Sequence, residues 1–199
     1  MNSCGIVDIF VVLGYHAKQI KELLDNRVSY ILNKEFATTN NIYSLWCARN
    51  ELKGNAFVCL YSDVFFDRTI LKDCLEKEGD IVLAVETNLV PETCRVKIKE
   101  GLIKGIGKEI PDSEASGNFI GISKFSKIGS EILFEEIERT IQDGENLDAY
   151  FIKSLDELIN RGQHVYYSEV SGRVWIDIDT MDDLERAINE LYPKLRRGL

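Results

Sequence analysis

The chain has 199 residues, and its 45% hydrophobic content is enough for one large core or two small ones. Its 24 Lys and Arg against 33 Asp and Glu give a formal net charge of −9. Because such a chain repels phosphate backbones, a general DNA or RNA binder is disfavoured. No apolar run approaches the ~20 residues that cross a bilayer, and Met1–Gly5 offers no secretory n-region. We therefore expect a soluble, cytoplasmic protein without a membrane partner.

The cysteines and histidines support the same expectation. The five cysteines are odd in number, widely scattered and without a C-x-x-C pair, and the two histidines stand near no cysteine pair. This usage fits a reducing compartment, and a structural zinc site is not expected.

In the first half of the chain, short apolar strands alternate with helical patterns. Continuous apolar strands separated by helices indicate a parallel sheet covered on both faces. In chain order we predict a strand at 10–13, a helix at 16–24, a strand at 28–32, a polar loop at 33–41, a helix with Ile42, Leu45 and Leu52 on its apolar face, a strand at 56–61, a helix at 69–78 and a strand at 81–85.

The second half changes character, because three strands there are joined by glycine-containing turns with no helix between them. No linker rich in Pro, Gly or Ser marks a boundary, so residues 1–199 are expected to form one α/β domain with an antiparallel insertion. The predicted elements are strands at 95–98, 102–106 and 118–125, helices at 127–142 and 147–160, strands at 165–170 and 174–178, and a helix at 181–191.

Acidic residues follow two of the apolar strands, where ligands bind in open α/β sheets. Asp63 ends the strand at 56–61, and Asp177 and Asp179 lie two residues apart in a strand, which predicts that they share a face. Carboxylates there are costly unless they are solvated, paired or bound to a cation, and Mg²⁺ with substrate phosphates meets that need. The alternative makes Asp63 a turn residue and Asp179 the N-cap of the last helix.

A polar cluster at 38–44 leads into the helix that follows. Its amides and hydroxyls, at Asn40, Asn41 and Ser44, could contact a base edge or a phosphate. The alternative is simple N-capping by Asn40 or Asn41.

These pieces, in this order, resemble the nucleotidyltransferases that activate phosphorylated small molecules, closest to bacterial phosphocholine and aminoalkylphosphonate cytidylyltransferases. The resemblance spans nearly the whole chain. It is carried by GIVDIFVVLGY at 5–15, the asparagine-rich loop at 33–44, the strand at 57–63, the segments at 95–97, 106–108 and 117–122, and WIDIDT at 175–180 followed by Asp183, Leu184 and Ala187.

The resemblance implies the nucleotide-diphospho-sugar transferase fold, a Rossmann-like, mostly parallel sheet with helices on both faces. It also implies transfer of a nucleotidyl group from a nucleoside triphosphate, expected to be CTP, to a phosphorylated or phosphonylated small molecule with release of pyrophosphate. Positioning and charge neutralisation supply most of such catalysis.

The same resemblance distributes roles among the candidate residues. Asp63 and one or both of Asp177 and Asp179 would hold Mg²⁺ on the triphosphate. The family usually has glutamate at the position of Asp177, and we favour Asp179 as the second ligand. In the asparagine-rich loop, Asn40, Asn41 and Ser44 would contact the base and ribose.

For the acceptor phosphate, the resemblance points to Arg95 and Lys108. The family tends to have lysine at the position of Arg95. Solvated surface charges are the alternative for both residues.

One departure from the family concerns the phosphate-binding unit. Members begin with a strand, a glycine-rich loop and a lysine-bearing helix that cradle the triphosphate, and this unit does not precede the strand at 10–13. We therefore expect an N-terminally truncated fold with impaired activity and a tendency to self-associate through exposed strand edges.

Two other function classes compete with this hypothesis. The first is a non-catalytic nucleotide-binding or regulatory remnant of the same fold, which stabilisation by no nucleotide would favour. A glycosyltransferase would show D-x-D after a central strand, whereas Ser62-Asp63-Val64 is not one.

Overall fold

The computed structural model describes residues 4–91, 93–170 and 172–197. The chain divides into two compact units, which are described separately: unit 1 comprises Met1–Ala56 and Lys127–Gln163, and unit 2 comprises Phe57–Ser126 and His164–Leu199. That residues 1–199 make a single domain stays a prediction.

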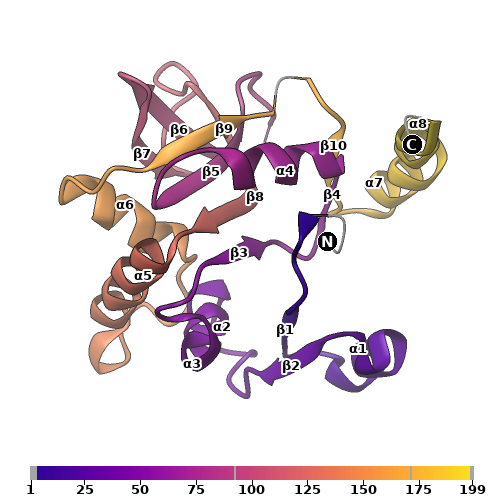
Figure 1. The fold of residues 1–199 in the computed structure, drawn as a ribbon, viewed down its shortest axis with the longest axis horizontal. Coiled ribbons are helices and arrows are strands. Elements are labelled where there is room, and N and C mark those ends of the chain that lie inside the picture. The colour runs from indigo at the N-terminus through magenta and orange to yellow at the C-terminus, as the bar shows by residue number, and fades with distance from the viewer. Residues whose placement is uncertain (1–3, 92, 171, 198–199) are drawn as a thin grey trace. The chain divides into compact units, whose positions relative to one another are not determined.

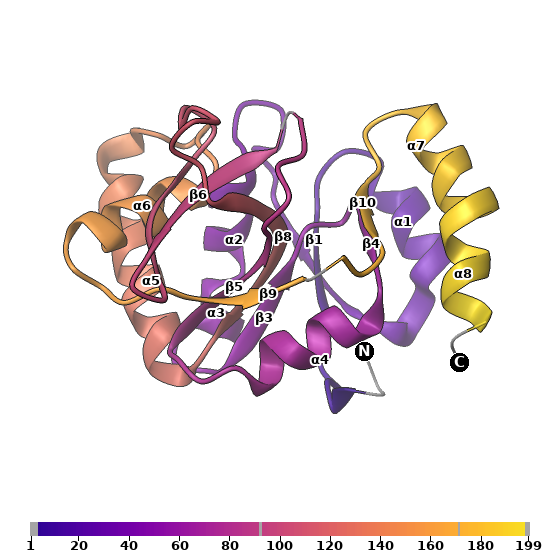
Figure 2. The same ribbon diagram turned by 90° about the horizontal axis from the view of Figure 1, so that it is seen from above.

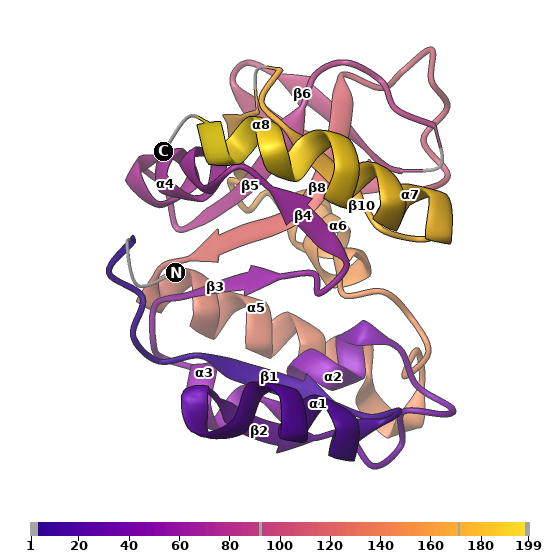
Figure 3. The same cartoon turned by 90° about the vertical axis from the view of Figure 1, so that its right-hand side faces the viewer.

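Unit 1 joins a two-stranded parallel sheet to a set of helices. The strands β1 (Phe10–Leu13) and β2 (Ser29–Leu32) lie side by side (Figure 3). Buried apolar side chains of α2 and α5, among them Ile42, Leu45 and Leu133, form its core. The helices are α1 (Ala17–Leu24), α2 (Asn41–Cys47), α3 (Arg49–Leu52), α5 (Lys127–Thr140) and α6 (Ile152–Asn160), with 3₁₀ turns η2 (Asp25–Arg27) and η3 (Gln142–Gly144).

The predicted helix at 147–160 begins later than expected, at Ile152. The residues before Ile152 do not form helical hydrogen bonds. The backbone carbonyls of Leu147 and Ala149 instead accept hydrogen bonds from the backbone N–H groups of Asn40 and Ile42. Contacts distant in sequence therefore override the local helical pattern, and they bring this segment against the asparagine-rich loop.

Unit 2 is built on a six-stranded mixed sheet, seen in Figure 1. Its order is β7-β6-β8-β5-β9, and β3 pairs with β8 as well. The strand at 81–85 is fully buried, as its apolar run predicts. The strands are β3 (Phe57–Leu60), β5 (Ile81–Glu86), β6 (Cys94–Lys99), β7 (Leu102–Gly107), β8 (Gly117–Phe125) and β9 (Tyr166–Glu169).

The antiparallel share of this sheet is larger than the sequence pattern indicates. The pair β5–β9 is parallel, whereas β8 runs antiparallel to β3, β5 and β6. A continuous apolar run indicates that both faces of a strand are buried, but it does not indicate whether the neighbouring strand is parallel or antiparallel. The direction of β3 and β5 relative to β8 could therefore not be predicted from the sequence. The α/β class with its antiparallel insertion is confirmed by the fold.

The rest of unit 2 surrounds a small second sheet. In it, β4 (Val64–Phe66) pairs antiparallel with β10 (Trp175–Asp177), while α4 (Arg68–Glu76) packs on the larger sheet. The last helix continues past its predicted end at 191: α7 (Met181–Arg186), a π-helical turn η4 (Ala187–Leu191) and α8 (Tyr192–Arg197) follow without a break (Figure 2). No helix within the described ranges has the length and apolar character needed to cross a membrane.

Candidate functional site

Three acids predicted from sequence gather around β10 in unit 2. Asp63 lies in the turn between β3 and β4, and its backbone carbonyl accepts a hydrogen bond from Ile178 N–H at 2.9 Å. Burial, together with the negative charges of Asp63, Asp179 and Asp183, raises the pKa of Asp177 to about 6. These carboxylates are therefore close enough to repel one another.

Among the residues that the structure describes, these acids have no basic partner. Within residues 4–91, 93–170 and 172–197, no ion pair involves Asp63, Asp177 or Asp179. Carboxylate oxygens are the ligands that Mg²⁺ prefers, so the chemistry of this donor set fits that ion. Over the same ranges, no group of three His, Cys, Asp or Glu side chains is arranged to hold a metal ion by itself, so water and substrate phosphates would have to supply most of the ligands.

The start of the last helix separates one acid from the others. Thr180, and not Asp179, is its N-cap: the Thr180 hydroxyl accepts from Asp183 N–H, and the Asp183 carboxylate accepts from Thr180 N–H at 2.9 Å. The hydrogen bond from the Thr180 hydroxyl is the main reason that the pKa of Asp183 is lowered. The capping alternative for Asp179 is therefore wrong, whereas Asp63 does lie in a turn.

The asparagine-rich loop in unit 1 is extensively hydrogen-bonded. The side-chain oxygen of Asn40, the N-cap of α2, accepts from Asn41 N–H at 2.7 Å, so the capping alternative holds for this residue. The side-chain oxygen of Asn41 accepts from Phe151 N–H, also at 2.7 Å. Both amide orientations follow, since a backbone N–H needs an oxygen partner.

The sequence did not single out Asn33, the first residue of this loop, as a site residue. In the structure its side chain is buried under the rest of the loop. Asn33 is only 2% exposed; its amide nitrogen donates to Thr39 Oγ1 at 3.0 Å and to Ser44 Oγ at 3.2 Å, and its oxygen accepts from Glu35 N–H. Asn33 comes directly after an apolar strand, so the rule that points to Asp63 could also have found it.

Arg95 is 7% exposed, and its guanidinium is fully engaged within unit 2. Nε and Nη2 contact Asp112 Oδ1 at 2.9 and 2.8 Å, while Nη1 donates to Val90 O, Thr93 Oγ1 and the Asn118 side-chain oxygen. This geometry ties the segment before β6 to the loop between β7 and β8, and each nitrogen of the guanidinium already has a protein partner. The solvated-surface alternative is wrong for Arg95.

Lys108 is exposed and directly follows β7, whose last residue Gly107 pairs with Arg95. The backbone therefore places the two predicted phosphate contacts at one end of the β6–β7 pair. Of the two, Lys108 alone presents its side chain toward solvent.

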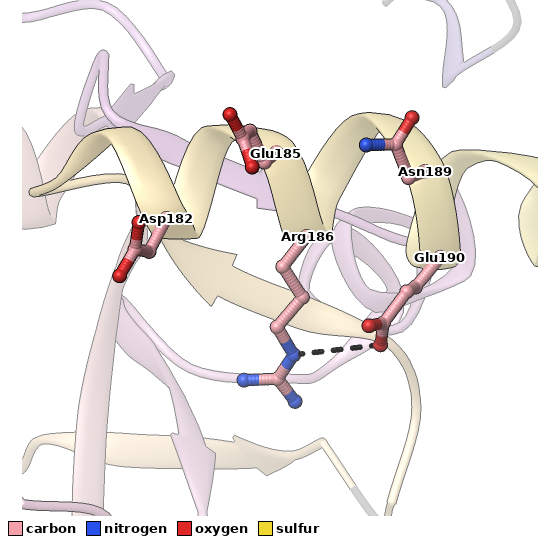
Figure 4. Close-up of a pocket in the computed structure, with 5 residues that line it drawn as sticks. All are labelled: Asp182, Glu185, Arg186, Asn189 and Glu190. Carbon is pink, nitrogen blue, oxygen red and sulfur yellow. Dashed lines mark ion pairs between the residues drawn. The ribbon is translucent and has the colours of Figure 1, made fainter.

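Two surface pockets lie away from these residues. One of about 380 Å³ is lined by Glu135, Glu138, Arg139 and Gln142 on α5 and the turn after it. The other, of about 220 Å³, follows the last helix, where Arg186 reaches toward Glu190 (Figure 4). None of the candidate site residues lines either pocket.

Comparison with known proteins places this chain among sequences of related function. It is 30% identical over 206 residues to the bifunctional IPC transferase and DIPP synthase of Aquifex aeolicus, matching 100% of this chain but 44% of that protein. It is 25% identical over 189 residues to the choline-phosphate cytidylyltransferase of Streptococcus pneumoniae, covering 94% of this chain and 79% of the relative. No family model matches.

Solved structures agree on the fold. The inositol-1-phosphate CTP transferase from T. maritima superposes with a TM-score of 0.76 at 20% identity, covering 98% of this chain and 79% of that one. The CTP:phosphocholine cytidylyltransferase from Streptococcus pneumoniae gives 0.74 at 22% identity over 96% of this chain and 81% of the other. At such identity these two matches bear on the fold alone.

Proposed function

Since this chain belongs to the nucleotidyltransferase family, we propose that it transfers a cytidylyl group from CTP to a phosphorylated or phosphonylated small molecule and releases pyrophosphate. The relatives are named for acceptors as different as choline phosphate and an aminopropylphosphonate, so the acceptor class stays this broad. The second activity in the name of the A. aeolicus relative is not part of the proposal, because this chain matches only 44% of that protein.

The uncompensated carboxylates of unit 2 carry the proposal. Asp63 and Asp179 are exposed, Asp177 is half-buried, and no described cation pairs with them. When bound there, Mg²⁺ would neutralise the triphosphate and stabilise the charge that develops on the leaving pyrophosphate. The carboxylates fix where that charge is neutralised, which is the main demand of phosphoryl and nucleotidyl transfer.

The reaction itself needs no protein nucleophile. An oxygen of the acceptor phosphate attacks the α-phosphorus and forms a new P–O bond, while the bond from the α-phosphorus to the bridging oxygen breaks and its electrons leave with pyrophosphate. Lys108 is the group we assign to the acceptor phosphate, because it is exposed and cationic.

For Arg95 the phosphate role stays a prediction, and Arg95→Lys tests it. A residue that binds phosphate through charge alone keeps most of its effect as lysine. A residue that joins loops through the five N–H donors of its guanidinium loses its effect as lysine, because an ammonium group cannot reproduce the planar arrangement of those donors. If Arg95→Lys loses thermal stability while the KM for the acceptor is unchanged, Arg95 stabilises the fold and does not bind the acceptor phosphate.

The direct experiment measures pyrophosphate release by the purified chain with CTP and Mg²⁺. The acceptors are choline phosphate, inositol 1-phosphate and 3-aminopropylphosphonate, each omitted in turn. Release that needs both an acceptor and Mg²⁺ supports the proposal. Binding of CTP without release under any of these conditions would favour the non-catalytic nucleotide-binding module instead.

A further inference from the structure

Two of the candidate carboxylates are attached to the small sheet of β4 and β10. Asp177 ends β10 and lies opposite Val64 of β4, and the backbone carbonyl of Asp63 accepts from Ile178 N–H at 2.9 Å. Each of the two strands has three residues. Because a two-stranded ribbon is only marginally stable by itself, the place of Asp177 depends on what holds this ribbon to the larger sheet of unit 2.

A buried carboxylate at the end of β5 makes such a connection. Glu86 is the last residue of β5 and is 5% exposed. Its Oε1 accepts from the backbone N–H of Asn88 at 2.9 Å and from the amide of the same residue at 2.8 Å, and its Oε2 accepts from Trp175 Nε1 at 3.4 Å. Trp175 begins β10 two residues before Asp177, so the two side chains share a face of that strand. The larger sheet is therefore bonded to the strand that carries a candidate cation ligand.

These contacts require two acceptor oxygens at residue 86. All three partners are donors, and in the part of the chain that the structure describes Glu86 forms no ion pair. A buried carboxylate held by neutral donors alone is costly. A glutamine of the same size would meet both donors of Asn88 with its single oxygen and turn its NH₂ group toward the indole N–H. The turn after β5 thus needs one oxygen, and the second oxygen serves Trp175.

We propose that Glu86 is a positioning residue, which holds Trp175 and thereby keeps Asp177 beside Asp63 for one shared cation. The inference rests on the proposed function, since it takes these acids as ligands of Mg²⁺. It adds to that function a residue that acts on the cation site through β10 and not by contact with the ion.

The test measures the dissociation constant of Mn²⁺, a probe for the Mg²⁺ site, by electron paramagnetic resonance on the whole chain at pH 8. Glu86→Gln keeps the size of the side chain and an acceptor for Asn88, but it loses the acceptor for Trp175. We expect Mn²⁺ to bind about tenfold more weakly, as when other residues that orient a metal ligand are changed.

A second variant breaks the same bond from the other side. Trp175→Phe keeps an aromatic ring and removes the indole N–H, so we expect a similar loss of Mn²⁺ affinity. The double variant Glu86→Gln with Trp175→Phe should bind Mn²⁺ no more weakly than either single variant, because both changes remove one interaction.

Two matched controls separate this bond from the other contacts near it. Asn88→Ala removes one donor to Glu86 Oε1 and leaves Trp175 its acceptor, so the Mn²⁺ affinity should stay as in the parent chain even if the melting temperature falls. Glu169→Gln changes an exposed carboxylate at the end of β9, which accepts from the Thr87 hydroxyl at 3.1 Å, and should also leave the affinity unchanged.

Three results would overturn the inference. If Glu86→Gln and Trp175→Phe bind Mn²⁺ as the parent chain does, Glu86 only supports the fold, and the proposed function stands. Additive losses in the double variant would mean that the two residues act independently. If the parent chain binds no Mn²⁺, the inference fails as well, and pyrophosphate release with CTP decides separately on the proposed function. If Glu86→Gln folds poorly, Trp175→Phe compared with Asn88→Ala decides in its place.

Discussion

The asparagine-rich loop of unit 1 and the carboxylates of unit 2 are held in opposite ways. In the loop, the side-chain oxygens of Asn40, Asn41 and Ser44 already have protein donors. Around β10, Asp63, Asp177 and Asp179 lie near one another without a cation among the described residues. The side-chain oxygens of the loop are satisfied within the protein, whereas the carboxylates repel one another. Changes to the first should therefore cost stability, and changes to the second should cost activity while sparing stability.

The largest effect on activity is expected from removing the charges of Asp63, between β3 and β4, and of Asp177, at the end of β10. Asp63→Asn combined with Asp177→Asn should lower Mg²⁺-dependent pyrophosphate release about 100-fold, because the cation loses its anionic ligands. The measurement is kcat/KM for CTP over a Mg²⁺ titration. A double variant that keeps the parent rate would separate these acids from the reaction.

Asn33→Ala tests the opposite side of the comparison. Removing a buried amide with three hydrogen bonds leaves Glu35 N–H and the Ser44 hydroxyl without their partner, so we expect a loss of about 2–3 kcal/mol in the free energy of unfolding. Urea denaturation measures it, with Asn55→Ala as the exposed control. A change below about 0.5 kcal/mol would contradict the view of a loop completed by its own bonds.

The pH dependence of stability sharpens the contrast. The pKa of Asp177 is raised from 3.8 to about 6 in the folded chain, so the folded state binds this proton more tightly than the unfolded state. Stability is thus lost as the pH rises from about 4 through 6. Neutralising the group in Asp177→Asn should raise the melting temperature at pH 8 by about 2–4 °C, after allowance for solvent exposure, and leave it nearly unchanged at pH 4.

Adding Mg²⁺ extends that measurement. At pH 8 the ion should stabilise the parent chain more than Asp177→Asn, and at pH 4 it should stabilise neither. An equal gain for both proteins at pH 8 would mean that the ion binds elsewhere.

The smallest effect concerns the cap of the last helix. Thr180→Ala removes the hydroxyl that Asp183 N–H contacts at 3.2 Å and should cost about 1 kcal/mol. Asp179→Ala should cost less, because Asp179 does not cap the helix. Thermal melts of the two variants make the comparison, and the reverse order would restore Asp179 as the cap.

The pattern of apolar residues predicted those elements whose apolar residues recur within one continuous segment. The apolar run at 81–85 is a buried strand, and the helix predicted at 127–142 is observed at Lys127–Thr140. The rest depended on partners far away in sequence. Residues 147–151 give up a helical pattern for hydrogen bonds to Asn40, Asn41 and Ile42. No spacing rule could anticipate those bonds.

The candidate site divides in the same way. Asp63 is predicted from its place after an apolar strand and Asp177 from its place within one, and the structure brings the two carboxylates close enough to interact. The phosphate role predicted for Arg95 rests on a charge that is visible in the sequence, whereas its acceptors at Val90, Asp112 and Asn118 are visible only in the structure. In the sequence, an arginine that is buried by such contacts looks the same as one that is exposed.

The strand β8 gives unit 2 a particular order of assembly during synthesis. It pairs with β3, β5 and β6, all of which precede it, and Leu60 of β3 meets Ile122 only after more than 60 further residues have been made. At about 5–20 residues per second this wait lasts several seconds. Until then the apolar strands β3 and β5, and the more polar strand β6, have been synthesised without the partner that joins them. The nascent chain is thus most exposed to aggregation just before its longest strand appears, and that interval is when a chaperone would act on it.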